Sequence, residues 1–202
     1  MTIERINSYS DDRFSQTALL QHGAFLVDQQ PCEVIINGVT SAFVSCPDPA
    51  ALDTLIAEFR FYAEHITCFT DEAGSVLSTF PPVELFSVPL NDIQPSQFFV
   101  DQDKLAAVQT FIHAPEDIVI PMIRHGGRFI SLDGHTRMAA AGSRGFEYVM
   151  GFITQSDDVI VRFAEEAMRR GVYMPQHLKL LPHEAYVVEW DGFCDDFFRE
   201  NT

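Results

Sequence analysis

Short apolar runs separated by turn-forming residues predict a β-hairpin in the first part of this chain. The strands are expected at 24–27 and 32–36, with the polar stretch 28–31 as the turn between them. Asn37-Gly38, a dipeptide that favours tight hairpin turns, leads into a third strand at 41–45. The first twenty residues are polar and mixed, which is typical of a loose or edge segment.

After these strands the apolar residues change to helical spacing. Asp48 is placed to cap a helix, and Pro49 suits the first helical position. One face of this helix would carry Leu52, Leu55, Ile56, Phe59, Tyr62 and Ala63. The pattern therefore predicts a helix over about 50–66.

The double proline Pro81-Pro82 interrupts regular structure and marks a junction near residue 80. Beyond the junction, strands are expected at 86–90, 118–124, 128–132 and 148–153, and helices at about 101–113 and 134–144. The tail adds a helix over about 157–170, short helices at 175–181 and 194–198, and a strand at 186–190.

This order of elements predicts an α+β fold in three parts. We expect an N-terminal α+β module at 1–80, a central domain at 81–155 and a C-terminal helical extension at 156–202 packed on that domain. A length of 202 residues and a hydrophobic fraction of 47% suit a packed globular protein of one or two small domains.

The stretch from Asp133 to Arg137 is the strongest candidate for a functional site. It follows an apolar strand and opens an alanine-rich helix. A helix start offers unpaired backbone N–H groups and the positive end of the helix dipole. Phosphate is the anion most often bound at such a position. Gly134 lets the backbone approach a ligand closely, and Arg137 can bind a phosphate through two parallel hydrogen bonds.

Two interpretations of this stretch remain open. In the functional one, Asp133 orients a hydroxyl or helps to hold Mg²⁺, and His135 donates to an anion or shuttles a proton. In the structural one, Asp133 is the N-cap of the helix and Arg137 pairs with it across one turn.

The run Asp-Gly-His-Thr-Arg between a strand and an alanine-rich helix resembles the signature loop of the ParB/sulfiredoxin superfamily. It is most similar to the branch whose loop reads Asp-Gly-His-His-Arg. The resemblance covers roughly 84–155, where an opening strand and turn, a first helix, the strand before the hairpin and a final strand follow in the same order. It implies a ParB/sulfiredoxin-like core preceded by a hairpin-plus-helix module.

The residues of this chain can also be compared with the motif of each branch of that superfamily. Sulfiredoxin chemistry needs a cysteine in the loop, and this loop has none. ParB itself uses an arginine-rich loop and a downstream DNA-binding region, and this chain has neither. In the branch of free-serine kinases, the loop aspartate corresponds to Asp133, but an upstream glutamate falls at Gln97, which cannot act as a carboxylate base. Asp101, Asp103 or Glu84 would have to replace it.

The resemblance therefore predicts a cytoplasmic protein that binds a nucleotide or a phosphorylated small molecule. The ligands it implies are ATP, ADP or CTP with Mg²⁺, and the enzyme it implies is a small-molecule kinase that uses ATP or ADP. A non-enzymatic interaction or regulatory protein is the alternative, and a DNA-partitioning or nuclease-type protein is a more distant one.

The candidate residues have distinct roles in this prediction. Asp133 and His135 are the catalytic candidates, and Asp133 is also the Mg²⁺ ligand. Gly134, His135, Thr136 and Arg137 are the phosphate-binding candidates. Arg124 and His125, at the neighbouring hairpin, are weaker candidates for which a surface role is favoured.

The charge composition of the chain disfavours negatively charged binding partners. The chain carries 29 acidic against 13 basic side chains and a formal net charge of -16, so DNA and anionic membranes would repel it.

The four cysteines form no CxxC pair, so neither zinc nor haem is expected, and free thiols in a reducing cytoplasm are predicted. No signal peptide and no run long enough to span a bilayer is visible, and a homodimer is compatible with the sequence.

Overall fold

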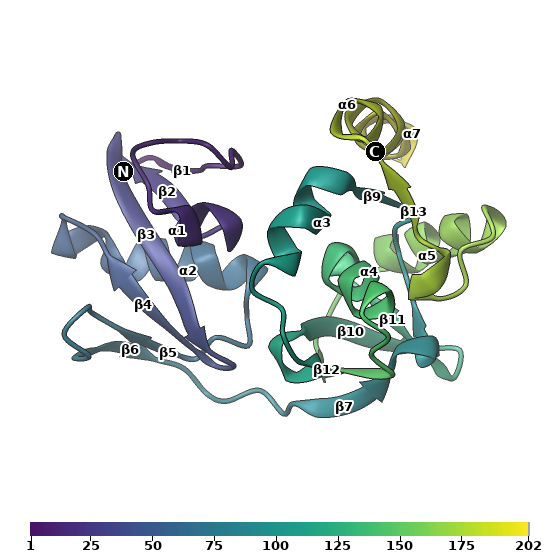
Figure 1. The fold of residues 1–202 in the computed structure, drawn as a ribbon, viewed down its shortest axis with the longest axis horizontal. Helices are drawn as coiled ribbons and strands as arrows, with labels where there is room; N and C mark the ends of the chain where they lie inside the picture. The colour runs from purple at the N-terminus through teal and green to yellow at the C-terminus, as the bar shows by residue number, and fades with distance from the viewer. Residues whose placement is uncertain (202) are drawn as a thin grey trace. The chain divides into compact units, whose positions relative to one another are not determined.

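The computed structural model describes residues 1–201, with side chains through Arg199, as two compact units (Figure 1). The first unit is Met1–Glu84 and the second begins at Leu85. The chain has an α+β fold, as the sequence predicts. The expected junction near residue 80 lies a few residues before the boundary between the units, and the tail after residue 156 belongs to the second unit.

The first unit is built on a six-stranded sheet whose strands follow sequence order. Its strands are β1 Ile3–Arg5, β2 Ala24–Val27, β3 Gln30–Gly38, β4 Ser41–Ser45, β5 Cys68–Thr70 and β6 Val76–Thr79. Neighbours are antiparallel except β4 and β5, which are parallel and are joined through the helix α2 (Leu52–Tyr62). A short helix, α1 (Gln16–Leu20), lies between β1 and β2. The core contains Phe25, Phe59 and Phe69, and the ring of Phe59 contacts the other two edge to face.

This sheet is larger than the hairpin-plus-helix module that the sequence predicts. The predicted strands at 24–27, 32–36 and 41–45 correspond to β2, β3 and β4. The strands β1, β5 and β6 have only three or four residues each, which is too short for an alternating pattern to be recognised. The first twenty residues are therefore not simply loose, because they contain β1 and α1.

The prediction that all four cysteines are free is wrong for Cys32 and Cys46, which form a disulfide. The β3–β4 register pairs Glu33 with Ser45, so the next residues outward lie opposite each other, with Cα atoms 4.5 Å apart. Register is a tertiary property that spacing in the sequence does not reveal. Cys68 and Cys194 are free thiols. The cysteines as a group therefore give no argument for a reducing compartment.

The second unit contains a mixed five-stranded sheet in the order β7-β12-β10-β11-β8. Its strands are β7 Phe86–Pro89, β8 Ile93–Gln94, β10 Val119–His125, β11 Arg128–Ser131 and β12 Tyr148–Ile153. The helices that precede the C-terminal segment are α3 Gln102–Gln109, α4 His135–Ser143 and α5 Val159–Arg169. Met138 of α4 packs among Val88, Ile120 and Met122 of the sheet, so the helix that follows the candidate loop is anchored in the core.

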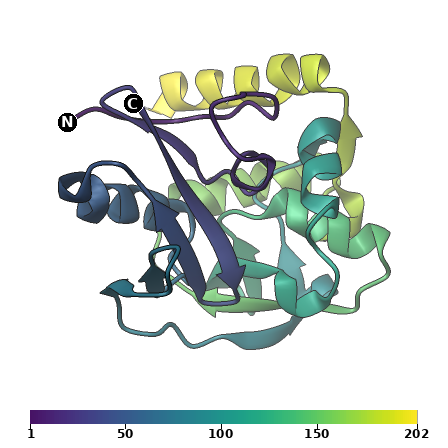
Figure 2. The ribbon, with the colours of Figure 1, turned by 60° about the vertical axis from the view of Figure 1, so that its left-hand side comes forward.

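The C-terminal segment departs from the prediction. After a single turn at Pro175–His177, β13 (Lys179–Leu181) pairs in parallel with β9 (Phe99–Asp101). Then α6 (His183–Tyr186), a π-helical turn (Val187–Asp191) and α7 (Gly192–Asn201) follow without interruption, as the yellow rod in Figure 2 shows. The predicted strand at 186–190 is therefore helical, and the predicted helix at 175–181 is a turn followed by a strand.

None of the helices in the described part of the chain is both long enough and apolar enough to cross a membrane.

Candidate functional site

The candidate loop lies between the end of β11 and the start of α4. Gly134 is the residue before the helix and has a φ of +83°, a conformation that favours glycine. A Cβ atom at this position would lie 2.5 Å from Cδ1 of the buried Ile120. Glycine is therefore required here both by the backbone conformation and by the close packing against β10.

The N-cap residue of α4 is Gly134, which has no side chain to accept from the first-turn amides. Asp133 precedes this residue and is exposed, so the interpretation in which Asp133 is itself the N-cap is wrong. By contrast, α3 begins with Asp101, whose carboxylate accepts from the backbone N–H of Asp103 at 2.8 Å. The N-cap positions of the two helices therefore differ, because α3 has a carboxylate there and α4 has no side chain.

Arg137 lies in the first turn of α4 and already makes two contacts. Its Nη1 donates to the carbonyl oxygen of Val119 at 2.9 Å, and its Nη2 lies 3.3 Å from Oδ2 of Asp133. The pairing with Asp133 across one turn, which is part of the structural interpretation, is therefore present. Since the guanidinium has five N–H groups, these two contacts leave others to bind an anion.

His135 is buried and links α4 to the strands around it. Its Nε2 accepts the backbone N–H of Ser96 at 3.2 Å and lies 3.1 Å from the hydroxyl oxygens of Ser96 and Ser131. Because a backbone N–H can only donate, Nε2 carries no proton and the ring proton is on Nδ1. Among residues 1–199, the hydrogen bonds of this ring all involve Nε2.

Burial is the main cause that lowers the pKa of His135 to about 4. The negative charge of Asp133 opposes this shift, and the positive charge of Arg137 adds to it. The imidazole is therefore neutral at pH 7 and is suited to donate from Nδ1. A role as proton shuttle, which the sequence also allows, would require a protonated form that burial disfavours.

The two weaker candidates lie away from the loop. Val119, which contacts Arg137, begins β10, whereas Arg124 and His125 end that strand. The guanidinium of Arg124 lies over the ring of Phe129, 4.6 Å from its centroid, so it has a packing role at the hairpin.

Gln97, where the resemblance places a catalytic glutamate, is held by the C-terminal segment. Its Nε2 donates to the backbone carbonyl of Phe99 and to the hydroxyl of Tyr186, the latter at 3.1 Å. Of the three replacements named from the sequence, Glu84 belongs to the first unit, while Asp101 and Asp103 lie a few residues beyond Gln97. Asp101 is 1% exposed and lies 2.7 Å from Nδ1 of His183.

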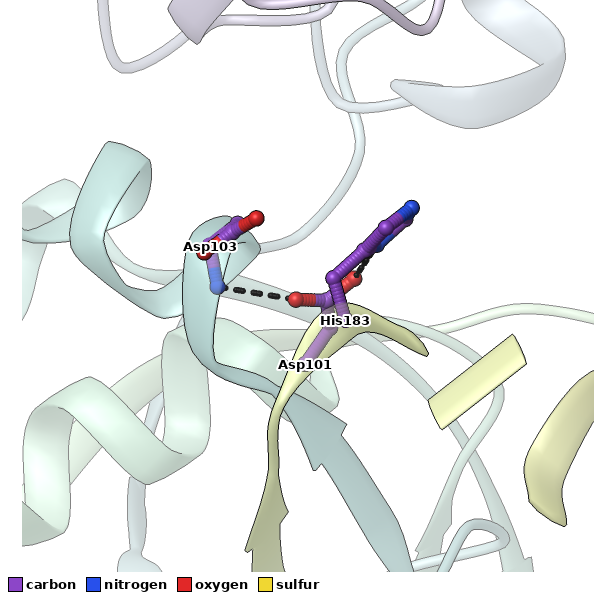
Figure 3. A group of neighbouring side chains, drawn as sticks. All are labelled: Asp101, Asp103 and His183. Atoms are coloured by element: carbon purple, nitrogen blue, oxygen red, sulfur yellow. Dashed lines mark hydrogen bonds and ion pairs between the residues drawn. The ribbon is translucent and has the colours of Figure 1, made fainter. Parts of the chain in front are cut away.

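Asp101, Asp103 and His183 form a second group of polar side chains (Figure 3). One potential metal-ligand atom from each lies within 4.8 Å of the others. These three side chains have structural roles that explain why they lie together. Asp101 caps α3 and pairs with His183, and the negative charge of Asp103 interacts favourably with the dipole of α3 in its first turn. We therefore assign no metal ion to it. The sequence did not indicate His183, since its partner is 82 residues away and no spacing relates them.

Comparisons with known proteins add little to this description. No protein-family model matches the chain, and no curated protein is similar to it in sequence. Among solved structures, protein Atu1540 from Agrobacterium tumefaciens matches part of the chain with 16% identity and a TM-score of 0.30. The match covers 46% of this chain and 51% of that one, which is about half of that structure's length. A likeness this distant carries no argument about function.

Proposed function

We propose that this protein binds phosphate, as a free anion or as part of a nucleotide, at the start of α4 in a ParB/sulfiredoxin-like core. The observation that carries the proposal is a helix start whose N-cap residue is a glycine and which adjoins an arginine and a buried neutral imidazole. The first-turn amides, the guanidinium of Arg137 and Nδ1 of His135 are all donors, which is the complement that an anion needs.

Each residue of the loop has a defined part in this proposal. Gly134 brings the backbone close to the ligand, and the amides of His135 to Arg137 donate to the phosphate oxygens. Asp133 accepts from a hydroxyl group of the ligand or contacts Mg²⁺. Since Mg²⁺ is commonly bound by one or two carboxylates together with water and substrate phosphates, the remaining ligands would be water and the phosphate oxygens of ATP, ADP or CTP.

Thr136 offers a direct test, because it lies in the first turn of α4 and is partly exposed. Thr136→Asp adds a negative charge that suits the helix dipole but repels a bound anion. We expect the wild type to bind at least one of ATP, ADP and CTP with Mg²⁺, or inorganic phosphate, in isothermal titration calorimetry. The variant should bind that ligand roughly tenfold more weakly or worse, since like charges a few ångströms apart near a surface repel by up to about 4 kcal/mol.

The matched control is Thr54→Asp, which places the same charge in the first turn of α2, in the other unit. It should leave the affinity unchanged. Absence of heat with every ligand in the wild type, or equal loss of affinity in both variants, would contradict the proposal.

Kinase activity is a finer proposal, and binding without turnover is its rival. The contact of Gln97 with Tyr186 favours the rival, because an amide at this position holds the C-terminal segment and cannot accept a proton. A phosphotransfer assay with small hydroxyl compounds distinguishes the two, since the rival predicts nucleotide binding without nucleotide consumption.

A further inference from the structure

The C-terminal segment, residues 179–201, is joined to the second unit at its beginning by a short sheet. β13 and β9 form a two-stranded parallel sheet of three residue pairs, and α6 begins two residues later at His183. A sheet of this size is marginal by itself. Side-chain contacts must therefore determine how firmly the beginning of this segment is held.

His183 makes one of these contacts, with Asp101 at the end of β9 (Figure 3). Its Nδ1 lies 2.7 Å from Oδ2 of Asp101, while the other carboxylate oxygen accepts the backbone N–H of Asp103. Asp101 is 1% exposed, whereas the side chain of His183 is 56% exposed. The carboxylate is thus a buried anchor, and the imidazole can exchange its proton with solvent.

The charges around His183 favour its protonated form. The hydrogen bond with Asp101 and the negative charge of that carboxylate raise the pKa of His183, and the slight burial of the ring opposes the shift. Among the other groups of α3, Asp103 adds to the shift and Lys104 opposes it. The pair is therefore ionic while the imidazole is protonated, and it becomes a hydrogen bond between a neutral imidazole and the carboxylate when the imidazole loses its proton.

We propose that residues 179–201 are a pH-sensitive strap, which the protonated His183 fastens to Asp101 and which loosens at alkaline pH. A raised folded-state pKa means that this fastening is complete below the ordinary histidine pKa of about 6.5. It is lost as the pH rises through the raised value. The proposal does not depend on phosphate binding at α4.

Other contacts keep the loosening partial and local. Trp190 packs edge to face on Phe98, with ring centroids 5.0 Å apart, and Phe193 packs on the same ring. Two neighbouring groups do not titrate in the relevant range, because burial raises the pKa of Tyr186 and raises that of Cys194 to about 11. Loosening of the strap should affect mainly the segment between β8 and β9, because Gln97 in that segment contacts Tyr186 of the strap. The neighbouring Ser96 contacts His135 at the start of α4.

Trp190 is the single tryptophan of the chain and lies within the strap, so its fluorescence reports the strap directly. We expect the opening equilibrium, measured by acrylamide quenching of Trp190, to increase as the pH rises above the ordinary histidine pKa of about 6.5. The increase should be roughly two- to fivefold, the factor associated with loss of an exposed ion pair.

Two variants of the full chain complete the experiment. His183→Gln removes the titrating group, so its quenching should be independent of pH. His113→Gln makes the same replacement at an exposed histidine in the same unit and should titrate as the wild type does. A wild type without a pH response overturns the proposal. So does a response that persists in His183→Gln or disappears in His113→Gln.

Discussion

At the scale of single residues, Gly134 sets the geometry of the candidate site. Its positive φ turns the chain from β11 into α4, and the absence of a Cβ lets Ile120 lie against the backbone. The sequence indicated that a glycine before a helix start is suited to close approach. It could not indicate that the close neighbour is a core side chain of β10, because that contact depends on how α4 packs on the sheet.

Gly134→Ala is expected to destabilise the protein for two reasons. The left-handed conformation costs about 1–2 kcal/mol for a residue with a Cβ, and the clash with Ile120 adds about 1–3 kcal/mol of overpacking. Urea unfolding measures the sum. Gly171→Ala is a matched control, because Gly171 has the same φ of +83° and no atom within 4 Å of its added Cβ. Equal losses of the free energy of unfolding in the two variants would show that the contact with Ile120 does not contribute to stability.

His135 shows which part of the site sequence reasoning could predict. The motif identified it as a polar residue at the helix start, and that placement follows from local spacing. Its neutral form depends on Ser96, 39 residues away, and on burial. Both are consequences of the assembled fold, so the sequence left open the choice between N–H donor and proton shuttle.

At the scale of elements, the predicted strand at 186–190 is the clearest error. Tyr186, Val187 and Val188 have a local preference for strands. However, Tyr186, Trp190, Phe193 and Phe197 recur at helical spacing, and Trp190 and Phe193 pack on Phe98 and Phe163. Burial of these rings stabilises the helix and overrides the local preference.

The β3–β4 pair carries a prediction at the same scale. Its register places Cys32 against Cys46, which are separated by 14 residues in the chain. A disulfide that closes a loop of this length contributes about 3 kcal/mol by restricting the unfolded chain. Dithiothreitol should therefore lower the melting temperature of the wild type, measured by differential scanning calorimetry. Cys46→Ser should melt at the lowered temperature with or without the reductant, and a reductant effect in that variant would count against the disulfide.

At the scale of the whole molecule, the net charge of -16 bears on the choice of partner. Affinity for the phosphate backbone of DNA comes largely from lysine and arginine, and acidic residues outnumber them by more than two to one. A small anion contacts only the donors at one helix start, so it is less affected by charges elsewhere, which salt screens. The composition therefore favours a small ligand over a nucleic acid.

We expect no retarded band in an electrophoretic shift assay with duplex DNA at low salt. The reason is repulsion over the whole surface, so the result should not depend on DNA sequence. A retarded band that weakens steeply as salt is added would support the DNA-partitioning alternative, because a steep salt dependence indicates binding through the phosphates of DNA.

The sequence by itself determined the α+β class, most strands and helices of both units and the position of the candidate loop. These features follow from periodicity, turn residues and capping, which act over a few neighbouring residues. Tertiary structure alone decided the Cys32–Cys46 disulfide, the neutral state of His135, the contact of His183 with Asp101 and the helical state of the C-terminal segment. Each of these depends on side chains from distant parts of the chain, whose register and burial are settled only when the sheets and helices pack.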